Sequence, residues 1–313
     1  MKRAALRGSG ALALPTLAAI ALVLLTGSAR AAGSLHEYWV AAVPVTWHVV
    51  PNERDAIGGD RFLARKTTFQ TIVYREFTPN FAKQIPNALG DRGIQGPLIR
   101  ARVGDTILVH LRNLDSLLNR PHSMHFHGVS YRPGSDGAFI LGFSGPGANV
   151  KPGETFTYRL VAGPDSAGVW PYHDHSPSMT DSISGGLYGA LSILAPGERA
   201  PDDELVVYLE SQLGFMTIDG RAFVGNTPVF HAKVGDVVQW DVLALGDDFH
   251  SFHVHGHRWR TPGGGVIDTQ TVGPAESFKI RWLEDAPGTW FYHCHVESHM
   301  MNGMIGIYRV APR

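Results

Sequence analysis

The sequence is poor in cysteine and in charge, and each shortage excludes a class of protein. Its 313 residues include one cysteine, Cys294, so no disulfide can form within the chain. Charged residues make up only 18% of the chain and the formal net charge is −1, which argues against a nucleic-acid-binding protein. Long segments with a 3.6-residue apolar period are also missing, which argues against a helical fold. The lone cysteine is therefore a buried apolar residue, a reactive thiol or a metal ligand.

A long apolar run occurs only near the N-terminus. Basic residues precede an apolar stretch at about residues 11–25, and Ala29-Arg30-Ala31 follows it as an A-x-A cleavage site. This pattern predicts a signal peptide over residues 1–31 and a secreted or periplasmic protein. A membrane anchor is the alternative, although the run is short for a spanning helix. No later segment predicts a membrane span, so we expect no membrane attachment after cleavage.

The rest of the sequence repeats itself. Three blocks recur in the same order: 97–105 matches 228–236, 122–128 matches 250–256, and 168–175 matches 288–295. Period-two alternation within each half predicts strands at 106–111, 155–160, 237–242 and 277–282. We therefore expect an all-β protein with two homologous domains, at 34–196 and 203–313, each an antiparallel β-sandwich with Greek-key links.

Histidine is unusually clustered. The chain has 16 histidines, and H-x-H motifs occur at four places along it. In a strand, residues i and i+2 point to the same face, so each H-x-H presents two imidazoles side by side. Paired imidazoles suit the binding of a transition metal. Ten histidines lie in these clusters: His125, His127, His173, His175, His250, His253, His255, His293, His295 and His299.

The most specific cluster surrounds the cysteine. On a strand, Cys294 points away from its two flanking histidines, so one metal site can lie on each face. His299 and Met304 follow in a loop that can fold back to the cysteine. One thiolate, two imidazoles and a weak thioether are the ligands of a blue copper centre, and His250 supplies the second imidazole. A zinc site is the alternative, but a lone cysteine among so many histidines fits zinc poorly.

These four motifs resemble the copper-binding motifs of multicopper oxidases, and their occurrence in two domains resembles the bacterial two-domain small laccases. The resemblance covers about residues 90–313 and implies cupredoxin-like domains with four coppers per functional unit. It assigns the type 1 copper, in the second domain, to His250, Cys294, His299 and Met304. It assigns the type 2 copper to His125 and His253, and the type 3 pair to His127, His173, His175, His255, His293 and His295.

The resemblance also implies an activity. A laccase-like enzyme would oxidise phenols or aromatic amines one electron at a time and reduce O₂ to water. Electrons would enter at His250 or His299, whichever is less buried. Asp136 and Asp268 match acids beside the cluster's water channels, and the alternative for Asp136 is an ordinary turn residue. Tyr131 matches a tyrosine beside the cluster, and simple packing is its alternative. The family further implies a homotrimer whose copper cluster lies between subunits.

The first domain should lack a blue centre. In the internal alignment, His122 matches His250, but Asp174 stands in place of Cys294 and Met179 in place of His299. We expect no copper at His122.

Three other functions remain open. A metal-ion oxidase acting on Cu(I), Fe(II) or Mn(II) would share every motif. A copper nitrite reductase would not need four H-x-H pairs. An electron-transfer protein would need only the blue centre and would leave eight histidines unexplained.

Overall fold

Strands dominate the computed structural model, which describes residues 33–86 and 93–313. The predicted signal peptide at 1–31 lies outside the described residues. The helices found are short: α1 (Ala64–Thr67), α2 (Met179–Ser184) and α3 (Glu297–Met301). No helix among the described residues is both long enough and apolar enough to cross a membrane. The prediction of an all-β protein is confirmed.

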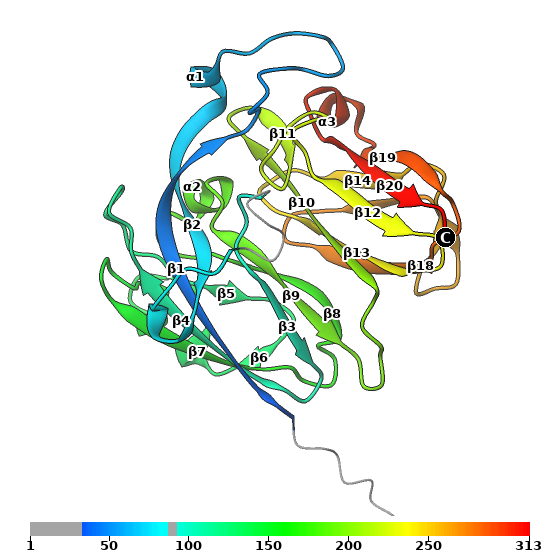
Figure 1. Cartoon of the computed structure of the whole chain (residues 1–313). Coiled ribbons are helices and arrows are strands. Elements are labelled where there is room, and N and C mark those ends of the chain that lie inside the picture. Colours follow the sequence, from blue (N-terminus) through cyan, green and yellow to red (C-terminus); the bar gives the residue numbers. More distant parts are fainter. Residues whose placement is uncertain (1–32, 87–92) are drawn as a thin grey trace, which may run out of the picture. The chain divides into compact units, whose positions relative to one another are not determined.

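The first half of the chain forms two sheets that enclose one apolar core, the blue to green part of Figure 1. One sheet has the strand order β2-β1-β4-β7-β6, and the other has the order β3-β9-β8-β5. The strands are β1 (Leu35–His48), β2 (Thr68–Phe77), β3 (Leu98–Arg102), β4 (Thr106–Asn113), β5 (His125–Phe126), β6 (Ser130–Tyr131), β7 (Thr155–Val161), β8 (Gly168–His173) and β9 (Tyr188–Leu194).

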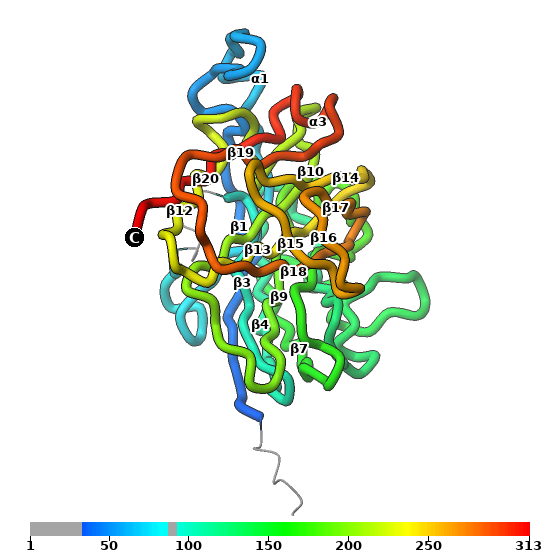
Figure 2. The backbone as a smooth tube through the Cα atoms, turned by 90° about the vertical axis from the view of Figure 1, so that its right-hand side faces the viewer, coloured from blue at the N-terminus to red at the C-terminus, as the bar shows by residue number. Residues whose placement is uncertain are grey.

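The second half, the yellow to red part of the trace in Figure 2, repeats this plan in its strand orders. Its sheets have the orders β11-β10-β13-β18 and β12-β20-β19-β14-β17, with a small β15-β16 ribbon. The strands are β10 (Asp203–Gln212), β11 (Phe215–Ile218), β12 (Val229–Lys233), β13 (Val237–Ala244), β14 (His250–Val254), β15 (Trp259–Arg260), β16 (Val266–Ile267), β17 (Thr269–Val272), β18 (Ser277–Leu283), β19 (Gly288–Cys294) and β20 (Ile305–Ala311).

Matching contacts show that the repeat extends to side chains. The Tyr172 hydroxyl donates to the Pro97 carbonyl at 2.6 Å, and the Tyr292 hydroxyl donates to the Pro228 carbonyl at 2.8 Å. The sheets are mixed, however, because β1 runs parallel to β4 and β10 runs parallel to β13. The expectation of purely antiparallel sheets was wrong, because the chain leaves this sheet after β2 in the first half and after β11 in the second, adds one strand to the other sheet, and returns beside β1 or β10.

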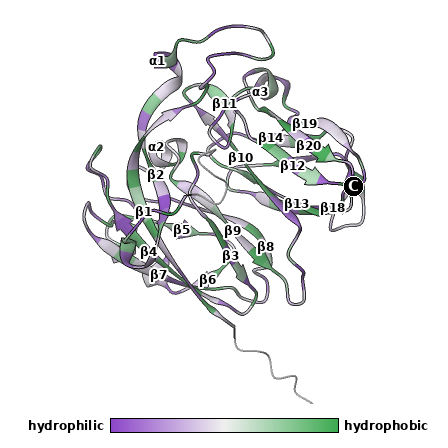
Figure 3. Cartoon of the chain, in the orientation of Figure 1, coloured by the Kyte–Doolittle hydropathy of each residue, from purple (hydrophilic) through white to green (hydrophobic). Residues whose placement is uncertain are grey.

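The two halves are joined by apolar packing as well as by residues 195–202. A third apolar cluster contains Trp47 and Val49 of the first half and Tyr208, Phe223 and Leu243 of the second. Hydrophobic and hydrophilic residues both occur along single strands, as Figure 3 shows for β1, so one side of such a strand can face a core. The described residues form a single compact unit, and this packing fixes the positions from which the histidines project.

Candidate metal centres

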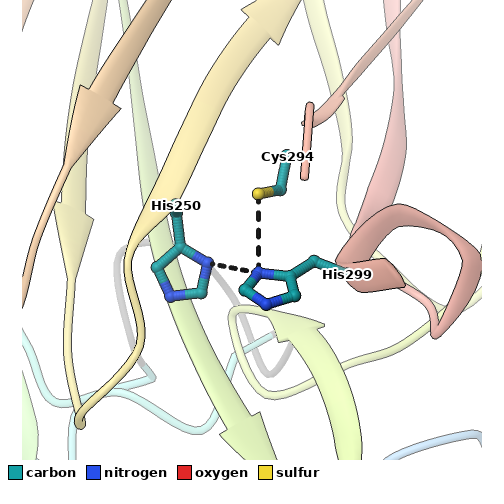
Figure 4. Close-up of side chains that lie close together, drawn as sticks. All are labelled: His250, Cys294 and His299. Atoms are coloured by element: carbon teal, nitrogen blue, oxygen red, sulfur yellow. Dashed lines mark hydrogen bonds between the residues drawn. The ribbon is translucent and has the colours of Figure 1, made fainter. Parts of the chain in front are cut away.

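The first candidate centre joins the ends of two neighbouring strands to a short helix. His250 begins β14, Cys294 ends β19, and His299 lies in α3 (Figure 4). The Cys294 Sγ is 3.7 Å from His299 Nδ1, which is 3.2 Å from His250 Nδ1. The cluster predicted from the sequence is therefore assembled, although its three members span 50 residues.

The surroundings of this centre fit a copper ion. Burial lowers the pKa of His250 to about 4, with the neighbouring His299 ring adding to the effect, so the imidazole is neutral and offers a lone pair. Cys294 is fully buried, and its Sγ accepts a hydrogen bond of 3.3 Å from the Ser251 N–H. Met304 is also fully buried, and its carbonyl accepts the Cys294 N–H at 3.2 Å. Buried imidazole and sulfur donors are the set that suits a blue copper centre.

The two imidazoles of this centre differ in access to solvent. His250 is 1% exposed, whereas His299 is half-buried. His299 is therefore the less buried of the two imidazoles. By the criterion of lower burial, it is the expected site of electron entry.

A second set of histidines lies in the first domain. The Nε2 atoms of His127 and His173 face each other at 3.2 Å, and the rings of His125 and His175 lie 5.4 Å apart. Burial lowers the pKa of both His127 and His173 to about 4, with the neighbouring imidazoles adding to the effect. The four imidazoles predicted to act together in this domain are brought together.

A third set in the second domain repeats this geometry. The Nε2 atoms of His255 and His293 face each other at 3.1 Å, and the His295 ring lies 5.4 Å from that of His293. The His293 Nδ1 contacts the Cys294 carbonyl at 2.9 Å, just as the His173 Nδ1 contacts the Asp174 carbonyl at 3.0 Å.

These contacts decide which nitrogen can bind a metal. A carbonyl only accepts a hydrogen bond, so Nδ1 of His173 and of His293 must carry the proton, and Nε2 keeps a lone pair. Metal-binding histidines are commonly oriented in this way. The Nε2 lone pair of His173 or of His293 thus points at the Nε2 of its neighbour about 3 Å away, and a cation there could be bound by both nitrogens. The residues present therefore fit the copper cluster that the motifs predict.

The second and third sets do not meet within one chain. The first-domain set lines a cavity of about 510 Å³, together with α2, the end of β10 and the loops at 245–248 and 274–275. Among the described residues, no hydrogen bond or ring contact joins a histidine of one set to a histidine of the other. Each set thus holds half of the eight imidazoles.

The two predicted acids reach the centres through their backbones. The His125 Nδ1 donates to the Asp136 carbonyl and the His253 Nδ1 donates to the Asp268 carbonyl, both at 2.7 Å. The Asp136 carboxylate also lies 3.5 Å from the His125 Nδ1, whereas the Asp268 carboxylate accepts a hydrogen bond from Thr269. The sequence could not predict the carbonyl contacts, because any residue at these positions supplies a carbonyl.

The predicted tyrosine lies beside the first-domain set. The Tyr131 ring centre is 6.1 Å from that of His125, in an edge-to-face arrangement. Burial raises the pKa of Tyr131, and the Asp136 carboxylate raises it further.

In the first domain, an ion network stands where the second domain has its cysteine. His122 is held 3.1 Å from Asp115 through Nε2 and 3.9 Å from Asp174 through Nδ1, and all three side chains are buried. Burial opposes ionisation of His122, but hydrogen bonds and charge from Asp174 and Asp115 raise its pKa. Sequence reasoning missed Asp115, which resembles an ordinary loop acid.

Comparison with known proteins identifies the family. Models of the multicopper oxidase family match residues 74–198 and 199–313. The chain belongs to the multicopper oxidase family. Its fold is similar to that of the blue copper oxidase from Nitrosomonas europaea, at 22% identity and a TM-score of 0.68, covering 88% of this chain and 86% of that one. The cupredoxin-like Greek-key fold implied by the motifs is therefore confirmed.

Two sequence relatives of this multicopper oxidase carry names of different activities. It is 32% identical over 242 residues to the probable nitrite reductase-hydroxylamine oxidoreductase fusion protein of Kuenenia stuttgartiensis, covering 69% of this chain and 27% of that protein. It is 28% identical over 342 residues to Ferroxidase HEPHL1 of Homo sapiens, covering 87% of this chain and 29% of that protein. The chain spans less than a third of the length of either relative.

Proposed function

We propose that this multicopper oxidase is laccase-like, oxidising phenolic or aromatic-amine donors one electron at a time and reducing O₂ to water. The observation that carries the proposal is the presence of two facing imidazole pairs, His127 with His173 and His255 with His293, in addition to the cysteine centre. When bound, copper supplies one-electron redox chemistry at the cysteine centre and O₂ reduction at a three-copper cluster.

The proposed ligands follow the sequence motifs. The type 1 copper would be held by His250, Cys294, His299 and Met304, the type 2 copper by His125 and His253, and the type 3 pair by His127, His173, His175, His255, His293 and His295.

The donor would meet the protein at His299. The Asn302 amide donates to the Gly214 carbonyl at 2.7 Å, so the turn after β10 lies against the end of α3. Leu213 on that turn is 49% exposed and Met301 of α3 is 50% exposed. Exposed apolar side chains on this turn and on α3, the helix that carries His299, favour an apolar aromatic donor over a small hydrophilic one.

Protons would be held by side chains near the imidazoles. Asp136 lies beside His125, Asp268 lies beside His253, and Tyr131 packs against the His125 ring. Carboxylates at these positions can take protons from water and release them towards the cluster.

Completion of the cluster needs a second copy of the chain. We infer a homotrimer in which the first-domain set of one subunit meets the second-domain set of the next, a head-to-tail contact that a ring can close. An exposed apolar loop supports this contact: Leu141 is 84% and Phe143 is 88% exposed. The loop is tied to the first-domain set, because the Phe139 N–H donates to the His175 carbonyl at 2.9 Å. An apolar loop of this kind is typical of an interface.

Other assignments are distinguished by their donors and copper content. A metal-ion oxidase would use the same centres, and one relative carries the name ferroxidase. A nitrite reductase is disfavoured, because two complete imidazole sets exceed the needs of a single catalytic copper. The sequence pattern at residues 1–31 supports export of the enzyme.

Oxygen uptake by the copper-loaded protein with a methoxyphenol tests the proposal, beside its Cys294→Ser variant. We expect uptake by the parent, four coppers per chain, and no uptake by the variant. If the protein is blue, binds four coppers and consumes O₂ only with Fe(II), Cu(I) or Mn(II), its donor is a metal ion and not a phenol. Release of nitric oxide from nitrite, with two coppers per chain, would refute the oxidase assignment.

A further inference from the structure

The turn that carries His255 is exposed, unlike its counterpart in the first domain. The turn follows β14 and is closed by a hydrogen bond of 3.2 Å from the His257 N–H to the Val254 carbonyl. Gly256 adopts φ +73°, and a Cβ there would lie 2.7 Å from the Trp290 ring, so only glycine fits. His255 is exposed, whereas His127 of the first domain is half-buried in the cavity described above.

A buried histidine anchors this turn from below. The His257 Nδ1 donates to the His255 carbonyl at 2.7 Å, and its Nε2 contacts the Glu284 carboxylate at 3.1 Å. His257 is 7% exposed and the Glu284 side chain is completely buried.

Glu284 is itself held by several donors. It accepts hydrogen bonds from Trp282 Nε1 at 2.9 Å, from the Tyr308 hydroxyl, and from the backbone N–H of Ala286 at 3.0 Å. Burial would raise the pKa of this carboxyl, but these bonds and His257 lower it to about 2, so it is ionised. The carboxylate is fixed in one position, and it fixes His257 in turn.

Among the described residues, the first domain has no such network at the equivalent positions. The strand registers show that Ala162 in the first domain is equivalent to Glu284 in the second, and that Leu191 is equivalent to Tyr308. The sequence repeat places Val129 opposite His257. The same fold is therefore built with apolar residues in the first domain. Because a buried pair of polar side chains is often no more stabilising than apolar residues of similar volume, folding alone does not explain Glu284.

We propose that Glu284 is a positioning residue for the metal cluster: through His257 it fixes the His255 carbonyl, and so holds the exposed turn that aims the His255 imidazole at His293. The inference rests on the proposed binding of copper by His255 and His293. The second domain needs this anchor because the rest of the chain leaves its turn exposed, whereas the first-domain imidazoles lie in a cavity.

Three variants of the full-length, copper-loaded protein separate positioning from folding. Glu284→Ala removes the anchor and leaves His257 without its partner. The double variant His257→Val/Glu284→Ala installs the residues that the first domain has at these two positions. Glu284→Gln keeps the shape without the charge. For each, we would measure unfolding by urea and the copper retained against increasing chelator, with the blue absorbance of the Cys294 centre as an internal reference.

We expect Glu284→Ala to lose both stability and cluster copper. The double variant should recover most of the stability yet still bind cluster copper about tenfold to a hundredfold more weakly, as is typical when an outer hydrogen bond to a ligand is lost. Glu284→Gln should bind cluster copper with intermediate affinity. The blue centre should keep its copper in all three.

Two results would overturn the inference. One is a double variant that retains cluster copper as well as the parent does. The other is loss of blue and cluster copper in equal proportion, which would show that Glu284 only stabilises the domain. Failure of the proposed function would look different, because the parent itself would then bind copper only at the blue centre.

Discussion

The two domains provide an acceptor for the same backbone N–H group with different side chains. In the second domain the Ser251 N–H donates to the Cys294 thiol, and in the first domain the equivalent Ser123 N–H donates to the Asp174 carboxylate at 2.7 Å. The hydrogen-bonded backbone is thus preserved while the ligand is lost. Asp115, with His122, completes the first-domain network. A metal-binding end of this fold can therefore be replaced by a buried ion network without altering the strands around it.

At the positions of Glu284 and His257 the difference is reversed, because here the second domain has the buried polar network. There the first domain is apolar and the second contains Glu284 and His257. Of these two buried networks, the one at Asp115 and Asp174 contains His122, and the one at Glu284 contains His257 and lies beside His255. The comparison shows that the repeat fixes backbone positions, whereas function decides the chemistry placed on them.

The largest effect should come from making the second domain resemble the first at the cysteine. Cys294→Asp should abolish the blue absorbance and reduce donor-driven O₂ uptake to background, because a carboxylate cannot replace the thiolate of a blue centre. Absorption spectra and an oxygen electrode measure both. A blue Cys294→Asp protein would show that the comparison misplaces the centre.

The acids should differ between domains by a smaller factor. Asp136→Asn and Asp268→Asn should lower turnover by about 10²-fold, the usual contribution of a positioned acid or base. Asp136→Asn should have the larger effect, because its carboxylate lies 3.5 Å from His125. Copper content should stay constant, since the histidine contacts are to backbone carbonyls. Unchanged turnover and pH profiles in both variants would contradict the assignment.

His122 of the first domain should contribute to the free energy of unfolding and not to copper binding. His122→Ala leaves two buried carboxylates without their partner and should lower the free energy of unfolding by about 3–5 kcal/mol. Urea unfolding measures this loss, and metal analysis should show the same copper per chain as the parent. His250→Ala is the matched control in the second domain, and it should lose one copper. Loss of one copper from His122→Ala as well would refute the comparison.

A smaller effect, confined to pH, concerns Glu210 of β10. Burial raises the pKa of Glu210 to about 8, with Asp248 and Asp247 adding to the effect. The folded carboxyl then binds its proton more tightly than the unfolded one. Stability of the copper-free protein should therefore fall as pH rises from about 4.5 towards 8, by at most about 1.4 kcal/mol per pH unit.

Glu210→Gln should remove this part of the pH dependence and unfold at higher urea than the parent at pH 8. Urea unfolding at several pH values tests it. The register places Val43 at the corresponding position of the first domain, where no such titration is expected. A variant with the same pH dependence as the parent would show that Glu210 is ionised in the fold.

The sequence predicted the parts of the site that depend on local spacing. Period-two patterns placed β4, β7, β13 and β18 correctly, and the H-x-H pairs aim their imidazoles together as a strand requires. It did not predict Asp115 or Glu284, because a buried acid and a turn acid look alike in a sequence. The partners of Glu284, such as Tyr308, come from other strands and are brought near only by the sheet register. Parallel pairing of β1 with β4 was missed for the same reason.

The division of the eight imidazoles into two separate sets has a consequence for how the enzyme behaves at low concentration. In the proposed trimer, no chain owns a complete cluster, so dissociated chains would stay blue and accept electrons without consuming oxygen. Oxygen uptake per chain would then decline on dilution while the colour persisted. The rate of O₂ reduction per chain would then depend on the fraction of chains in trimers, and so on the protein concentration.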